Sequence, residues 1–140
     1  MKKSICFFIL CCTCFFTEAQ QIVLTDEELF DWKLLKVKAS AYNSTHKQTV
    51  GNPSIGAWGD TLKPGMKAVA ISRDLLKLGI SRGTPIKIEG YDGIYFVKDK
   101  MNARYRMKID IYMGTNIQKA RNFGNQRLLI WYGVPKKLED

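Results

Sequence analysis

The sequence VKDKMNARYRMKIDIYM, residues 97–113, contains two acidic residues embedded in strand-forming hydrophobic sequence. Asp99 follows the apolar run 94–97, and Asp110 lies inside the run 109–113. Both runs are rich in β-branched and aromatic residues, which predicts two strands. A carboxylate in such a run is poorly solvated, and burial raises its pKa. Two such acids, joined by one short connection, are candidates for acid–base chemistry.

Basic residues crowd the same stretch and leave a second interpretation open. They are Lys98, Lys100, Arg104, Arg106 and Lys108. Nearby positive charge favours the ionised carboxylate, so each aspartate also fits a structural ion pair. Burial has to outweigh that charge if either acid is to hold a proton at neutral pH.

Residues 1–19 have the features of an export signal. Lys2 and Lys3 precede an uncharged apolar run over residues 5–16, and Thr17 and Ala19 suit cleavage after Ala19. The run is shorter than the roughly 20 residues that a membrane-spanning helix needs, so no transmembrane segment is expected in the mature form. We therefore expect an exported protein, periplasmic or extracellular.

All four cysteines fall within this predicted signal, at Cys6, Cys11, Cys12 and Cys14. A mature chain without cysteine has neither disulfides nor thiolate metal sites. A lipid anchor is a weaker alternative, because the residues before Cys12 and Cys14 make a poor lipobox. The lone His46 is expected to be a solvated loop residue, since no second histidine is present to build a site. No metal or cofactor is expected.

The formal charge of the 140-residue chain is +9, and loss of Lys2, Lys3 and Glu18 with the signal lowers it to +8. A strongly basic exported protein suits an anionic partner outside the cytoplasm: a cell-wall polymer, a lipid headgroup or a nucleic acid. The basic residues are scattered along the chain, whereas nucleic-acid-binding proteins more often concentrate them in a stripe. Nucleic acid is therefore not the expected partner.

Residues 20–35 are predicted to form an N-terminal helical extension. Thr25 and Glu28 have the spacing of a capping box, and Leu29, Trp32 and Leu35 would then face inward from the helix that follows. Alternating apolar and polar residues predict a strand that ends near Tyr42. Residues 43–59 are rich in polar and turn residues and are expected to form a long loop, a type of segment that often carries function.

The rest of the chain is predicted to consist of short elements. They are a strand over 67–72 with Val69 and Ile71 inward, a helical turn over 73–79 ended by Gly79, a hairpin of 85–89 and 94–97 around 90–93, a helix from Thr115 to Phe123 with Ile117, Ala120 and Phe123 on one face, and a strand over 127–132. The barrel domain is assigned to residues 36–133 and a charged tail to residues 134–140. Many short strands without βαβ alternation favour a small, mainly β barrel.

Three blocks of sequence resemble the three-aspartate domain family, which is related to the catalytic barrel of membrane-bound lytic transglycosylase A. The blocks are AYNST-HKQT-VGNP-SIGAWGDTLKPG from residue 41, AVAISRDLLKLGI from residue 68 and YFVKDKMNARYRMKIDIYMG from residue 95. The resemblance covers about residues 37–131, with the blocks in the family's order. It implies a six-stranded double-psi β-barrel with short helices.

The same resemblance implies a site. Two of the family's three aspartates match Asp99 and Asp110, and Asp110 is at the position of the general acid/base. Ser72 replaces the first aspartate, while Asp74 lies two residues on, in a helical turn expected to aim it elsewhere. Four further residues match cleft positions that would contact sugar, although each also fits a structural role: Tyr42, Thr49, Trp58 and Asn102.

The implied activity is that of a secreted peptidoglycan lytic transglycosylase, which cleaves the bond between N-acetylmuramic acid and N-acetylglucosamine and forms an anhydro-muropeptide. The implied partner is the glycan strand of peptidoglycan. The alternative is a non-catalytic peptidoglycan-binding barrel, motivated by Ser72 at the position of the first acid and by the charge of +8. A third hypothesis, an exported nucleic-acid-binding or host-interaction protein, rests on charge alone.

Overall fold

A computed structural model describes residues 25–44, 52 and 54–137. The predicted signal peptide, the two candidate lipidation cysteines, His46 and Thr49 lie outside these residues. The described elements, in chain order, are α1 (Asp26–Leu29), β1 (Phe30–Tyr42), β2 (Ala68–Ile71), the 3-10 helix η1 (Arg73–Leu78), β3 (Pro85–Ile88), β4 (Tyr91–Lys100), β5 (Lys108–Tyr112), α2 (Ile117–Phe123) and β6 (Gln126–Pro135).

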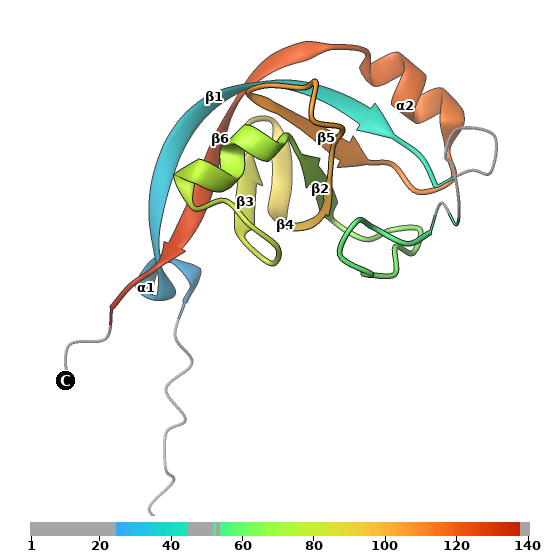
Figure 1. Ribbon diagram of the computed structural model, residues 1–140. Helices are drawn as coiled ribbons and strands as arrows, with labels where there is room; N and C mark the ends of the chain where they lie inside the picture. Colours follow the sequence, from blue (N-terminus) through green and yellow to red (C-terminus); the bar gives the residue numbers. More distant parts are fainter. Residues whose placement is uncertain (1–24, 45–51, 53, 138–140) are drawn as a thin grey trace, which may run out of the picture.

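The strands of the described residues close into a barrel in the order β1-β5-β2-β4-β3-β6 (Figure 1). Two neighbouring pairs are parallel, β1 with β5 and β2 with β4. The other four pairs are antiparallel. This arrangement confirms the predicted fold class, a mainly β, six-stranded double-psi barrel with short helices. Within the described part of the chain, no helix has the length and hydrophobicity that crossing a bilayer requires.

The barrel interior is filled by β-branched residues at alternating strand positions. Ile109 and Ile111 of β5 are buried in the core, as are Val69 and Ile71 of β2, which were predicted to face inward. Burial of each such side chain contributes roughly 1.5–3 kcal/mol. Because alternate residues of a strand point to opposite faces, burial of Ile109 and Ile111 places Asp110 on the outer face.

The N-terminal segment differs from its prediction. Glu28 does reach back to Thr25, since its Oε2 accepts hydrogen bonds from the Thr25 N–H at 2.7 Å and from Oγ1 at 2.8 Å. However, α1 ends at Leu29 and β1 begins at Phe30, so the predicted helical placement of Trp32 and Leu35 is wrong. The reason is the long antiparallel ladder of β1 with β6, which starts at Phe30 and outweighs a short helical pattern (Figure 1).

The predicted hairpin is present with a shifted turn. Ile88 of β3 pairs with Tyr91 of β4, so Glu89 and Gly90 form the turn and Gly90 adopts a φ of 77°. The sequence instead suggested a turn over residues 90–93. A positive φ is the conformation that a tight hairpin turn requires and that glycine adopts without strain.

The two later helices follow their predictions with small differences. Gly79 ends η1 in the left-handed conformation, as expected. The cap of α2 is Asn116, whose Oδ1 accepts from the Lys119 N–H at 2.8 Å, so the prediction of Thr115 as cap is wrong by one residue. Ala120 and Phe123 are buried as predicted, and Ile117 is half-buried. The last strand continues to Pro135 and does not stop at Tyr132.

Candidate functional site

The two candidate acids lie in one row that crosses four neighbouring strands. Ser40 of β1 pairs with Asp110 of β5, Asp110 pairs with Ala70 of β2, and Ala70 pairs with Asp99 of β4. Residues paired in register point to the same face of a sheet. The two aspartates therefore share the outer face of the barrel, with their Cα atoms two strand spacings apart, about 10 Å.

A β-bulge in β4 puts Asp99 into this row. Val97 pairs with Val69 inside the barrel, whereas the next residue of β2, Ala70, pairs with Asp99, so Lys98 is the extra residue. Without the bulge, Asp99 would share the face of the buried Val97. A bulge inserts one unpaired residue and re-aims the side chains that follow it. The bulge thus turns the carboxylate from the core to the outer face.

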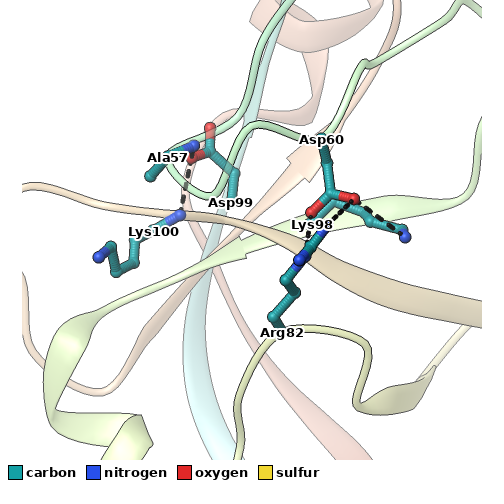
Figure 2. Close-up of polar contacts among 6 residues, drawn as sticks. All are labelled: Ala57, Asp60, Arg82, Lys98, Asp99 and Lys100. Carbon is teal, nitrogen blue, oxygen red and sulfur yellow. Dashed lines mark hydrogen bonds and ion pairs between the residues drawn. The ribbon is translucent and has the colours of Figure 1, made fainter.

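Backbone amides, and not basic side chains, bind the Asp99 carboxylate. Its Oδ1 accepts hydrogen bonds from the Ala57 N–H at 2.6 Å and from the Lys100 N–H at 2.8 Å (Figure 2). Ala57 belongs to the loop between β1 and β2, which therefore packs against β4. The contact is close, because a Cβ atom at Gly56 would lie 2.4 Å from the Lys98 carbonyl oxygen.

The two lysines next to Asp99 in sequence have partners of their own: Lys98 pairs with Asp60, and Lys100 lies over an aromatic ring. Asp60 accepts hydrogen bonds from Arg82 Nε at 2.7 Å and Nη2 at 3.0 Å, and Lys98 Nζ lies 3.5 Å from its Oδ1 (Figure 2). The hydrogen bonds with Arg82 hold the pKa of Asp60 below its usual range. Lys100 Nζ lies over the Trp58 ring, 5.2 Å from its centroid. Within the described residues, no guanidinium group forms an ion pair with Asp99 or Asp110.

Asp110 is half-buried and accepts a hydrogen bond from Ser40 Oγ at 2.9 Å. Burial raises the pKa of Asp110, and the negative charge of Asp99 adds to this effect. The Ser40 hydrogen bond and the positive charge of Lys108 act in the opposite direction, but the net pKa is above the usual value. Lys108 Nζ lies over the Tyr105 ring, 4.8 Å from its centroid. At Asp110, the effect of burial on the pKa therefore outweighs the effect of the neighbouring positive charge.

Tyr42 lies beside both acids. Burial raises its pKa above the usual value, and the charges of Asp99 and Asp110 raise it further. Its ring packs against Tyr112 with 5.4 Å between centroids. Among the described residues, its buried hydroxyl has no hydrogen-bond partner.

The other predicted site residues are less closely associated with the acids. Trp58 is half-buried and belongs to the loop whose Ala57 N–H binds Asp99. Asn102 is exposed, and its Oδ1 accepts from the Arg104 N–H at 3.0 Å within its own turn. Thr49 is outside the described residues. The site thus brings together Asp99, Asp110 and Tyr42, with Trp58 on the adjoining loop.

Ser72, which the sequence resemblance aligns with an aspartate, forms hydrogen bonds with the backbone. It is fully buried, its Oγ accepts from the Lys108 N–H at 3.0 Å, and its own N–H donates to the Lys108 carbonyl at 2.8 Å. Asp74 belongs to η1 and not to the row, and its Oδ2 accepts from the Met107 N–H at 2.8 Å. Met107 has a φ of 45°, a conformation that non-glycine residues rarely adopt.

Sequence reasoning missed Ser40 and the Ala57 amide. Ser40 could have been found, since it alternates with Ala39 and Ala41 on the outer face of a predicted strand. The Ala57 N–H comes from a loop and carries no sequence signal, because every residue other than proline has such a group.

Comparisons with known proteins show similarity in structure alone. No protein-family model matches the chain, and no curated protein matches it. A solved structure of an expansin from Clavibacter michiganensis without ligand is 17% identical and covers 76% of this chain, with a TM-score of 0.48. A mutant of the same expansin in complex with cellohexaose is also 17% identical and covers 77% of this chain, with a TM-score of 0.48. The chain spans about half of those proteins, 53% and 54% of their lengths.

Proposed function

We propose that the row of Ser40, Asp110 and Asp99 binds a glycan strand of the bacterial cell wall, and that Asp110 cleaves it as a lytic transglycosylase. The observation that carries this proposal is the half-buried carboxyl of Asp110, whose pKa burial raises, on an outer face that it shares with a second carboxylate. A general acid is most effective when its pKa lies near the working pH, and burial moves Asp110 in that direction. The predicted signal peptide supports the proposal, because the glycan lies outside the cytoplasm.

The reaction needs one group that first donates and then accepts a proton. Protonated Asp110 donates to the glycosidic oxygen as the bond from C1 of the muramic acid breaks. The resulting carboxylate then takes the proton of the C6 hydroxyl, whose oxygen bonds to C1 and closes the anhydro ring. Asp110 regains its proton and no water is consumed. The attacking group is part of the substrate, so proximity favours its attack.

Asp99 and Ser40 have supporting roles in this mechanism. The Asp99 carboxylate, positioned by two backbone N–H groups, stabilises the positive charge that develops on the sugar. Ser40 holds the Asp110 carboxyl in place through its hydrogen bond. Tyr42 offers its hydroxyl and Trp58 its ring for sugar contacts.

The test is digestion of purified sacculi with the exported protein, followed by mass spectrometry of the soluble products. Anhydro-muropeptides are expected from the wild type and not from Asp110→Asn, which keeps an acceptor for Ser40 but cannot donate the proton. Folding of the variant is checked by circular dichroism. Undiminished release by a folded Asp110→Asn protein contradicts the proposal.

A second candidate is a barrel that binds the wall polymer without cleaving it. The observation in its favour is Ser72, which fills the position of the family's first acid and is committed to the backbone of Lys108. This candidate expects the protein to pellet with sacculi and to release no soluble products. The same digestion distinguishes the two candidates.

A further inference from the structure

Four basic side chains lie on the outer face of the barrel next to the candidate acids. Lys38 of β1 pairs in register with Arg127 of β6 on one side and with Lys108 of β5 on the other. Lys36 precedes Lys38 by two residues and so lies on the same face of β1. We call Lys36, Lys38, Lys108 and Arg127 the basic row.

The side chains of the basic row form no ion pair with an acid of the described residues. Two shallow grooves open on it, of about 280 and 230 Å³. They are lined by Lys36, Val37, Lys38, Met107 and Arg127, and by Lys38, Lys108, Asn125, Gln126 and Arg127, with no acidic residue in either set. Within residues 25–44, 52 and 54–137, none of the four forms an ion pair. Like charges on paired strands destabilise a sheet, so a bound anion would relieve a repulsion that the fold maintains.

The basic row continues the row of acids along the same two strands. Lys38 precedes Ser40 by two residues and Lys108 precedes Asp110 by two, so each pair shares a face. Two residues of a strand correspond to about 7 Å. A polymer whose reacting bond lies at Asp110 therefore presents the substituents of the neighbouring ring positions to the basic row.

We propose that the basic row binds the carboxylates of the peptide stems that hang from the glycan strand, an inference that rests on the proposed function. In peptidoglycan the stem starts at C3 of the muramic acid, two ring carbons from the reacting C1, and carries free carboxylates. Its negative charge complements a row of cations that form no ion pair, and its attachment point matches the short distance from Asp110. The site would then select glycan that still bears peptides.

The experiment measures binding of the exported protein to end-labelled glycan strands, with their peptides and after an amidase has removed them. Phosphate-containing polymers are stripped from the strands beforehand. The variant is Lys38→Glu with Arg127→Glu, two exposed positions. The matched control is Lys33→Glu, an exposed residue five positions earlier in β1. Lys38→Gln with Arg127→Gln serves as a milder variant, and circular dichroism checks the fold of each protein.

The double charge reversal is expected to weaken binding to peptide-bearing strands by about tenfold at low salt, with a smaller loss in the glutamine variant and a reduced difference at high salt. Binding of the double variant to peptide-free strands is expected to change less than twofold. Lys33→Glu is expected to leave binding to both kinds of strand unchanged. Equal weakening on both strands, or none on either, overturns the inference. A loss that appears only on strands retaining their phosphate polymers overturns it as well, because the row would then bind phosphate.

The two proposals fail in different ways. If wild-type protein neither binds nor cleaves either kind of strand, the proposed function fails. If wild-type protein cleaves both kinds of strand and the charge-reversed variant shows no peptide-dependent difference, only the inference fails.

Discussion

Asp99 and Asp110 lie in one cross-strand row on the outer face of the barrel, two strands apart, with Ala70 between them. The connection of residues 101–107 does not by itself bring them together, because β2 is inserted between β4 and β5 in the barrel order. Ala70, the residue between them in the row, is small and buried. Their relationship is set by the barrel topology, and each of the following predictions tests one part of it.

The raised pKa of Asp110 predicts a dependence of stability on pH. The folded state holds this proton more tightly than the unfolded state, whose aspartate titrates near pH 3.9. The contribution of Asp110 to the free energy of unfolding should therefore fall as the pH rises from that value through the folded pKa, and stay constant above it. Asp60 and Asp74, whose pKa values are lowered, act in the opposite direction, so the fall is expected in the difference between wild type and Asp110→Asn, measured by urea unfolding at several pH values. Parallel pH profiles for the two proteins would contradict the prediction.

Removal of the Ser40 hydroxyl is expected to raise the pKa of Asp110 further. The Ser40 hydrogen bond lowers that pKa in the native protein, and alanine cannot make it. The shift can be followed by NMR titration of the Asp110 side-chain carboxyl carbon in Ser40→Ala. Ser81→Ala, at an exposed serine of another loop, is the control and should leave the titration unchanged. A downward shift in Ser40→Ala would show that the hydroxyl does not stabilise the ionised form.

Gly56 is required for the approach of its loop to β4. An added methyl group would meet the Lys98 carbonyl oxygen at 2.4 Å, so Gly56→Ala should displace the loop and weaken the hydrogen bond from the Ala57 N–H to Asp99. A cost of about 1–3 kcal/mol is expected from overpacking, measured by urea unfolding. Ala57→Ser, which keeps the backbone amide at an exposed position, should cost much less. Faster hydrogen exchange of the Ala57 amide in Gly56→Ala would identify the displaced contact.

The variant Tyr42→Phe tests whether the Tyr42 hydroxyl contributes to the stability of the fold or to glycan binding. The buried Tyr42 hydroxyl has no partner among the described residues, and an unsatisfied buried polar group costs about 1–3 kcal/mol. The phenylalanine variant should therefore be at least as stable as the wild type in urea unfolding. If the hydroxyl contacts the sugar, the same variant should bind glycan strands more weakly. A variant that is less stable and binds normally would assign the hydroxyl to the fold.

Much of the architecture is predictable because it depends on the alternation of apolar and polar residues along each strand. Ile109 and Ile111 identify the inner face of β5 and so place Asp110 outside, and Val69 and Ile71 do the same for β2. Residues 30–35 could not be assigned in this way, since the ladder with β6 involves residues about a hundred positions away and overrides the local helical signal.

The position of Asp99 also could not be predicted from alternation. Strict period two from Val97 would bury the carboxylate, and the bulge at Lys98 reverses that assignment. The Ala57 amide that binds Asp99 is equally invisible in sequence, since it depends on how a loop packs. Asp110 could thus be placed from its neighbours, whereas Asp99 required the tertiary structure.

Lys98 has no backbone partner in β2 and is a one-residue insertion in the pairing of β4 with β2. Its deletion would let β4 pair without interruption and would turn the aspartate that follows it inward, among the isoleucines and valines of the core. Barrels of this design can therefore gain or lose their second surface acid by an insertion or deletion of one residue, with every other side chain unchanged. Alignments that treat a gap at this point as neutral would miss such a difference.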